Sequence, residues 1–334
     1  MTTSAIALRR AAGEHPIARY VVKRLIVGVV MLAFVSVAIF FFTQALPGDV
    51  ARQVLGQSAT PDQIASLREQ LGLDRPVVVQ YFDWVGGLFT GELGRSLTSG
   101  LPVAEAIAPR VANSAVLVGV TVAILFPLAL AMGATAAARP RGIIDGIVTV
   151  LILLVIALPE FIIAILVIVI LATNVVKLFP PTSIIDSSQP LFAQTDLLVL
   201  PVLALVIGGL PYFTESIRTT LREELMSEYV TWARLTGIRE RRVLWRYALP
   251  NGIGPALQVA GTTLVYLTGG IVAVESVFAF PGIGAALTAA VANRDLPTVQ
   301  TITMLMAAVA LIIYLVADVC GILLTPKLRS ALAS

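Results

Sequence analysis

Long runs of apolar residues constrain this chain more than any other feature of its sequence. A membrane hydrocarbon core about 30 Å thick requires about 20 apolar residues in helical conformation. Only 13% of the residues are charged, whereas soluble domains carry roughly 25%, so the charge needed to cover a water-soluble surface is missing. We therefore expect an all-α polytopic membrane protein with six transmembrane helices. The segments that meet the length requirement are 22–46, 112–138, 146–173, 197–217, 253–275 and 299–325.

The positive residues near the spans predict the orientation of the chain. Lys and Arg are retained on the cytoplasmic side, and with the N-terminus inside, most of the 23 Lys and Arg residues fall in inside segments. Both termini are then cytoplasmic, as tails 1–20 and 326–334. The first apolar run is too long for a signal peptide and ends in Leu46-Pro47-Gly48-Asp49 without a clear cleavage site, so we expect it to be retained. No basic stretch is interleaved with aromatic residues, and we expect no nucleic-acid partner.

Several kinds of chemistry lack the residues they need. The chain has one cysteine, Cys320, and one histidine, His15, so it offers neither a Cys/His metal cluster nor a histidine-activated nucleophile. No Gly-Lys pair occurs, so no Walker A loop can hold ATP phosphates. We expect that the chain is not an enzyme, binds no cofactor or metal ion itself and draws its energy from elsewhere.

The first outside segment, 47–111, is too long to be a simple connection. Thr60-Pro61-Asp62-Gln63 combines an N-cap, a proline at the first helical position and a glutamine for a capping box, and Gly72 provides a stop. Either a packed extracytoplasmic cap or a docking site for an external partner fits this segment. The helix has an apolar face made by Ile64, Leu67 and Leu71, and a second element at the membrane interface carries Tyr81, Phe82, Trp84 and Phe89.

The inside segment 218–251 is the second informative loop. Its first half has helical apolar spacing and stops near Gly237. Ala233 and Gly237 are expected to form a notch that another chain can approach closely, and Leu249-Pro250-Asn251 starts the return into the membrane. A plain solvated loop is the alternative. The apolar positions are Leu221, Leu225, Tyr229, Trp232 and Ala233, and the basic cluster that follows consists of Arg239, Arg241, Arg242 and Arg246.

Three carboxylates stand out within the predicted spans. Insertion scales give a cost of about 2.5 to 3.5 kcal/mol for an acidic residue at a helix centre, so such groups face an interior, a partner or water. Glu160 follows Pro159 in the middle of the third span, where proline opens the helix, and it is the best candidate for lining a path. A hydrogen-bonded position between helices is the alternative for Glu160, and a structural role is the main interpretation for Glu275 and Asp318, which lie nearer span ends.

The inside segment resembles the cytoplasmic coupling segment of ATP-binding-cassette (ABC) importer permeases. The motif of that family is represented here by Ala233, Gly237, Tyr247 and Leu249-Pro250. It departs from the usual pattern at Thr231-Trp232 and at Tyr247, where an aliphatic residue is usual. The upstream pair Glu228-Tyr229, together with Ala233-Arg234, resembles the version found in the oligopeptide and dipeptide branch.

Other stretches support the same resemblance, which covers about residues 20–324. Leu46-Pro47-Gly48-Asp49, the loop DQIASLREQLGLDRPVVVQYFDW and the stretch GELGRSLTSGLPVAEAI resemble the first half of the B-type subunit of these permeases. Glu275-Ser276-Val277-Phe278 and Phe280-Pro281-Gly282-Ile283-Gly284 resemble its outer-side motif. These matches occur in order and agree with the predicted topology, which makes the resemblance specific.

The resemblance implies a type I importer permease fold in the bacterial plasma membrane. It implies a second homologous permease subunit, two ATPase domains that carry Mg-ATP, and an extracytoplasmic substrate-binding protein. Residues 21–111 would form the first span and outer loop, and 112–325 a five-helix core. Peptides are the expected cargo, although no residue distinguishes them from nickel, glutathione, opines or sugar compounds. The expected ATPase-coupling residues are Glu228, Tyr229, Ala233, Arg234, Gly237, Arg241 and Pro250, and the candidate translocation path contains Pro159, Glu160 and Glu275.

Two rival functions follow from the sequence. A secondary transporter or channel needs no ATPase and would be expected to show broken helices in two related halves. Pro159, Pro201 and Pro211 break helices, but no internal repeat is clear. An intramembrane enzyme would need a nucleophile with a base or a pair of aspartates, and Asp318 is the only clearly intramembrane aspartate.

Overall fold

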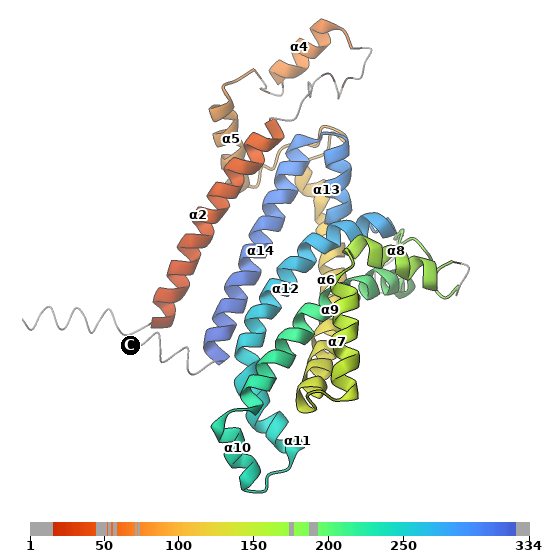
Figure 1. The fold of residues 1–334 in the computed structure, drawn as a ribbon. Coiled ribbons are helices and arrows are strands. Elements are labelled where there is room, and N and C mark those ends of the chain that lie inside the picture. The colour runs from red at the N-terminus through yellow and green to blue at the C-terminus, as the bar shows by residue number, and fades with distance from the viewer. Residues whose placement is uncertain are drawn as a thin grey trace, which may run out of the picture.

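The computed structural model describes residues 16–44, 52, 55, 59–70, 72, 74–173, 177–186 and 193–324. Within these ranges the regular elements are helices, and the only extended pairing is an isolated bridge between Arg95 and Pro102. Five helical stretches are long and apolar enough to cross a membrane, and a bent pair of helices makes a sixth candidate. The all-α, polytopic fold class is thus confirmed (Figure 1). The spanning helices are α2 (Pro16–Gln44), α6 (Val103–Ala138), the pair α7 (Ile143–Ile156) and α8 (Glu160–Leu171), α9 (Thr195–Leu225), α12 (Leu249–Phe278) and α14 (Leu296–Leu324).

The third span differs from its prediction as a continuous helix over 146–173. α7 ends at Ile156, α8 begins at Glu160, and the two axes differ by 108°. Pro159 adopts an extended conformation directly before α8, and the proline ring also disfavours the helical conformation for the residue before it. The expected opening at Pro159 is confirmed, and the prediction of one uninterrupted span is wrong.

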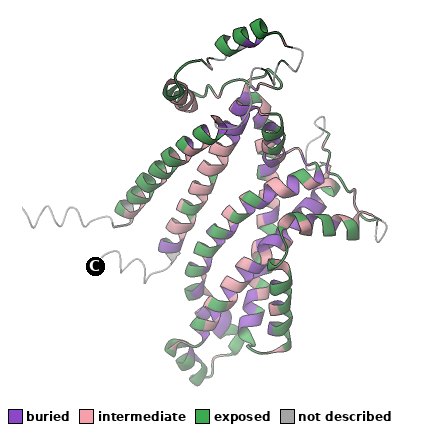
Figure 2. Cartoon of the chain, turned by 45° about the horizontal axis from the view of Figure 1, so that its top comes forward, coloured by how far each residue is buried: buried purple, intermediate pink, exposed green. Residues whose placement is uncertain are grey.

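Helix α9 lies at the centre of the bundle. In its apolar stretch 67% of the residues are buried, against 11% for α2 and for α14, and Figure 2 shows α2 exposed along much of its length. Small residues allow the central helices to approach closely: a Cβ atom on Gly133 of α6 would lie 2.8 Å from Ile217 of α9. Gly209 of α9 likewise faces Leu267 of α12. The core is therefore built by α6, α9 and α12.

The two informative loops lie at opposite ends of the bundle (Figure 1). α4 (Pro61–Gln70) and α5 (Val77–Thr90) are near one end, and α10 (Glu228–Leu235) and α11 (Glu240–Arg242) form the other. The capping box is confirmed, because the Thr60 amide donates to Gln63 Oε1 at 3.0 Å and the Gln63 amide donates to Thr60 Oγ1 at 3.4 Å. The motif 46–49, His15, Leu71 and the C-terminal tail lie outside the described residues, as do the side-chain contacts of Leu67.

Part of the aromatic group on α5 packs against the first span. The ring centroids of Phe40 and Tyr81 are 5.4 Å apart and those of Phe40 and Trp84 are 5.8 Å apart. Phe82 and Phe89 are exposed. The packed interpretation of this outer element therefore holds for the side of α5 that faces α2.

Candidate coupling surface and polar sites in the spans

The inside loop is helical in two pieces rather than one. α9 ends at Leu225, and α10 begins at Glu228 after Ser227, whose backbone is extended. The Ser227 hydroxyl donates to the Glu224 carbonyl at 2.6 Å, so it satisfies one of the free carbonyls at the end of α9. The prediction that a single helix runs through to Gly237 is wrong, since serine at this point starts a second helix.

The predicted stop at Gly237 is confirmed, with a defined geometry. Gly237 has φ +81°, the left-handed region in which glycine carries no steric cost. Its amide donates to the Arg234 carbonyl at 2.9 Å, and the Ile238 amide donates to the Ala233 carbonyl at 3.2 Å. This pair of bonds is the Schellman arrangement that closes a helix C-terminus.

The notch expected from Ala233 and Gly237 is open at only one of these residues. A Cβ atom on Gly237 would meet no atom within 4 Å, so that position faces free space. Ala233, however, is buried and belongs to an apolar cluster with Val230, Leu221 and Val243. The loop folds back over Ala233, and its small side chain serves packing within this chain.

Large apolar side chains are exposed on and beside α10. Met226 is 76% exposed, Trp232 71% and Leu235 81%. The segment that follows α10 forms a hollow of about 770 Å³, and its lining includes Gly237, Ile238, Trp245 and the basic cluster. We call Met226, Trp232, Leu235, Arg239, Arg241, Arg242 and Arg246 the coupling surface. The sequence spacing assigned Trp232 to an apolar helix face but gave no sign that this face points outward.

Arg234 has its partners within the chain. Its guanidinium forms a forked ion pair with Glu240, with Nε to Oε1 at 2.8 Å and Nη2 to Oε2 at 3.3 Å. Nη1 also donates to the Leu225 carbonyl at 3.0 Å. Arg234 thus has acidic and carbonyl partners within its own chain. Arg234 holds α10 to the segment that follows it.

Tyr229 joins three helical elements at the base of the loop. Its hydroxyl donates to Glu224 of α9 at 2.5 Å and accepts from Asn251 Nδ2 of α12 at 3.3 Å. Partial burial, and then the neighbouring Glu224 carboxylate, raise the pKa of Tyr229. The hydroxyl therefore remains protonated at neutral pH and holds α10 at a fixed place relative to both spans.

The fifth span begins earlier than expected. α11, the π-helical turn η2 (Val243–Ala248) and α12 form one helical stretch, Glu240–Phe278, in which Pro250 occupies the second position of α12. Proline cannot donate to the carbonyl four residues earlier, and the wider π turn lies directly before it. The helix therefore continues through Pro250, and the return into the membrane at Leu249-Pro250-Asn251 stays a prediction.

Glu275 is fully buried within the chain. Its carboxylate accepts hydrogen bonds from Ser114 Oγ of α6 at 2.5 Å and from the amides of Gly284 and Ala285 at 2.7 and 3.1 Å. The two amides belong to the first turn of α13 (Ile283–Ala292), a short helix that the sequence analysis missed. A Cβ atom on Gly282 would lie only 2.0 Å from Glu275 Oε1. The structural interpretation of Glu275 is the one that this geometry supports.

Ion pairs hold two other acidic residues of the spans. Asp318 of α14 lies 3.1 Å from Arg24 of α2, which agrees with the structural interpretation. Asp145, near the start of α7, lies 3.2 Å from Arg218 and 2.5 Å from Arg222 of α9. Both arginines belong to the predicted inside segment 218–251. They also join the third span to the fourth.

Glu160 is the first residue of α8 and lies at the bend of the third span. Its side chain is partly exposed and lies between α9 and α12, beside Gly208 and Gly270. The position of Glu160 next to Pro159 is given by the sequence. Its contacts with Gly208 and Gly270 could not be predicted from the sequence.

Comparison with known proteins places this chain in a family. Residues 96–330 match the binding-protein-dependent transport system inner membrane component, and residues 17–133 match the N-terminal part of membrane components of such systems. The probable peptide ABC transporter permease protein y4tP of Sinorhizobium fredii is 30% identical over 312 residues, covering 93% of this chain and 99% of that protein. The dipeptide transport system permease protein DppB of Lactococcus lactis subsp. cremoris is 32% identical over 312 residues, with the same coverage.

The chain belongs to the family of binding-protein-dependent transport system inner membrane components. It is the membrane permease subunit of an ABC importer, a multi-pass protein of the bacterial plasma membrane. The resemblance stated from its sequence motifs is thus confirmed, and a transporter that works without an ATPase is not favoured. A permease component is not an enzyme by itself, and membership of this family implies partnership with ATPase and binding-protein subunits.

Proposed function

We propose that this chain forms half of a translocation path for peptides. A second homologous permease subunit supplies the other half, two ATPase domains bind Mg-ATP on the cytoplasmic side, and an extracytoplasmic binding protein delivers the substrate. The chain itself binds no cofactor or metal ion in this scheme. Two relatives that align along nearly their whole length carry peptide or dipeptide transport in their names, which supports the choice of cargo.

The coupling surface is the observation that carries this proposal. Exposed tryptophan and arginine are the residue types most often found at the energetic centres of protein interfaces. Here Trp232 and Leu235 are exposed on α10, and the basic cluster follows α10 along the chain and lines its own hollow. Arginines present charged donors that fit carboxylates. A partner surface with an apolar groove and an acidic rim complements this arrangement, and we assign that surface to the ATPase.

The internal bonds of the loop allow it to transmit force. Tyr229 connects α10 to α9 and α12, and the Arg234–Glu240 pair connects α10 to α11. Movement of the ATPase would therefore displace the ends of the fourth and fifth spans together. In this proposal Tyr229, Ala233, Arg234 and Gly237 shape the loop, Glu228 and Arg241 are exposed to the partner, and Pro250 lies in the helix that receives the motion.

The proposed path uses Pro159 and Glu160 but not Glu275. The bend at Pro159 opens the third span where Glu160 is partly exposed, while Glu275 is closed off by its three hydrogen-bond donors. The cytoplasmic position of both termini and the division into first span with outer loop, 21–111, and core, 112–325, remain predictions from the sequence.

A pair of matched substitutions tests the assignment of the coupling surface. Trp232→Ser removes an exposed side chain from α10, and Phe89→Ser removes another exposed aromatic side chain from α5 near the opposite end. Loss of an interface anchor weakens binding by about tenfold or more. We expect Trp232→Ser to reduce both copurification of the ATPase and ATP-driven peptide uptake in proteoliposomes. Phe89→Ser should leave ATPase copurification unchanged.

Two results would contradict the proposed function. Equal loss of the ATPase in both variants would show that α10 is not the docking element. Peptide transport by the purified chain alone, reconstituted without ATPase or a second permease subunit, would remove the need for coupling.

A further inference from the structure

Three helices meet around the carboxylate of Glu160. The side chain leaves the first turn of α8 at the 108° bend and lies between α9 and α12. A Cβ atom on Gly208 of α9 would lie 3.5 Å from Glu160 Cγ, and one on Gly270 of α12 would lie 3.3 Å from Oε1. Two glycines therefore provide the space in which this carboxylate is held.

Each of these glycines has a tyrosine four residues away. Tyr212 follows Gly208 on α9, and Tyr266 precedes Gly270 on α12, so each glycine and its tyrosine share a helix face. The Tyr212 and Tyr266 ring centroids are 4.8 Å apart. The Glu160 carboxylate and the Tyr212 hydroxyl are both close to the Tyr266 hydroxyl. We call Glu160, Tyr212 and Tyr266 the bend site.

Glu160 differs from the other acidic residues of the spans in its partners. Arg24 pairs with Asp318, Arg218 and Arg222 pair with Asp145, and three donors hold Glu275. Among the ion pairs of the residues that the structure describes, none involves Glu160. Tyr266 is 38% exposed, and Glu160 and Tyr212 are partly exposed. A carboxylate without a cation is therefore accessible from outside the chain, beside two aromatic rings.

We propose that the bend site binds the ammonium group of the transported substrate, which for a peptide is its free amino terminus. A carboxylate supplies the counter-charge that an ammonium group needs in an apolar span. Tyrosine rings attract cations through their faces, and the hydroxyl oxygens accept hydrogen bonds from the ammonium. The same carboxylate repels the carboxyl terminus, so the peptide would enter this half of the path with its amino end at the bend. This inference rests on the proposed function.

A photo-reactive peptide tests the inference in the intact complex. The probe is a tripeptide with a free amino terminus and a diazirine in the side chain of its first residue, and a second probe carries the diazirine in its last residue. Both are supplied with the binding protein and ATP to the permease purified with its partner subunits, and labelled positions are mapped by mass spectrometry. We expect the first probe to label the segments of α9 and α12 around Tyr212 and Tyr266 more strongly than the second.

Two variants separate the effect of the charge of Glu160 from that of its side-chain length, and a third variant is the control. Glu160→Gln should lower labelling of these segments by the first probe about tenfold or more, because a charge-assisted hydrogen bond is lost. Glu160→Asp should retain a substantial part of the labelling. Glu105→Gln replaces an exposed carboxylate in the first turn of α6 and should leave the labelling unchanged.

Two results would overturn the inference while leaving the proposed function intact. In the first, wild-type complex takes up peptide with ATP, but the first probe fails to label the bend site or labels it equally in Glu160→Gln. In the second, Glu160→Gln reduces labelling by both probes equally, as expected if a cation of the second permease subunit occupies the site. Absence of ATP-driven uptake by the wild-type complex would instead contradict the proposed function.

Discussion

Gly237 is needed for the backbone conformation that ends α10. Nothing lies within 4 Å of a Cβ atom built there, so a larger side chain has room, but the φ of +81° is unfavourable for residues other than glycine. Asparagine tolerates this region, whereas a β-branched residue does not. The sequence motif predicted a need for close approach at Gly237. The structure adds a conformational need that operates before any partner arrives.

We expect Gly237→Val to destabilise the end of α10 by about 1 to 2 kcal/mol and Gly237→Asn to cause much less change. Hydrogen exchange at the Gly237 and Ile238 amides, which close the helix, measures this directly. Exchange should accelerate in the valine variant, and peptide-stimulated ATP hydrolysis by the complex should fall with it. Equal exchange in both variants would show that side-chain volume, and not backbone conformation, explains the glycine.

Residues with local partners could be predicted from the sequence, and residues with distant partners could not. The capping box at Thr60 and Gln63 and the stop at Gly237 depend on spacings of a few residues, and both are confirmed. The burial of Ala233 and the contacts of Glu160 with α9 and α12 depend on how the chain folds back. Those contacts decide which sequence candidates remain available to a partner or a substrate.

At the scale of elements, the length of the apolar runs predicted the five continuous spans well. It did not predict the short helix α13 or the bend in the third span. α13 has ten residues, too few to cross a membrane, so it escaped notice although its amides hold Glu275. Pro159 marked the place where the third span breaks, but not the angle of 108° between α7 and α8, both of which contact α9. The extension of α12 back to Glu240 was missed because its first turns are polar.

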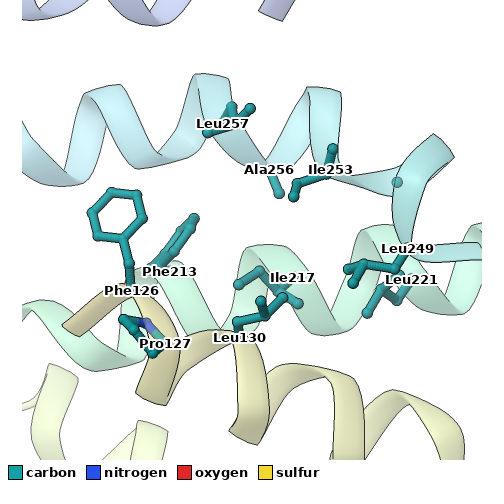
Figure 3. A pocket seen from close by; sticks show the side chains of 11 residues that line it. Phe126, Pro127, Leu130, Phe213, Ile217, Leu221, Leu249, Ile253, Ala256 and Leu257 are labelled. Carbon is teal, nitrogen blue, oxygen red and sulfur yellow. The ribbon is translucent and has the colours of Figure 1, made fainter. Parts of the chain in front are cut away.

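An apolar cavity of about 270 Å³ lies between α6, α9 and α12, and Leu221 and Leu249 of the inside segment are among its lining residues (Figure 3). Phe126, Ile217 and Ile253 are among its lining residues, and Ala256 of α12 points into it. Cavities of this kind weaken packing because the lining atoms lack partners. Space here also allows α12 to shift against α9, the movement that the proposed coupling requires.

We expect Ala256→Leu to fill this cavity, raise the thermal midpoint of the purified chain and slow peptide uptake. The added methylenes gain about 0.8 kcal/mol each when buried. Ala260→Leu is the matched control one turn further along α12, buried but not among the residues that line the cavity. It should lower the midpoint, since overpacking costs about 1 to 3 kcal/mol. A higher midpoint with unchanged uptake would show that the cavity plays no part in motion.

At the scale of the whole molecule, the first span is joined to the bundle by contacts along α14 and at α5. Near one end of α2, Gln300 Nε2 of α14 donates to Thr43 Oγ1 at 2.8 Å, and Ser36 Oγ lies 2.9 Å from the Tyr81 hydroxyl of α5. Towards the other end, Arg24 pairs with Asp318. An apolar hollow of about 490 Å³ lies between α2, α5 and α14. Polar contacts thus help to fix the position of α2, which is largely exposed, against α14 and α5.

A charge exchange tests whether the Arg24–Asp318 pair fixes α2 on the bundle. Asp318→Arg places two positive groups together and should lower the thermal midpoint and the uptake rate. Since Arg24 is 47% exposed, screening limits the pair itself to about 1 kcal/mol, and the added cost comes from an unpaired charge in a span. The double variant Arg24→Asp with Asp318→Arg should recover most of both losses. If the double variant recovers neither the thermal midpoint nor the uptake rate, the position of α2 depends on the Thr43–Gln300 and Ser36–Tyr81 contacts at its other end. In that case Gln300→Leu should lower both quantities more than Asp318→Arg does.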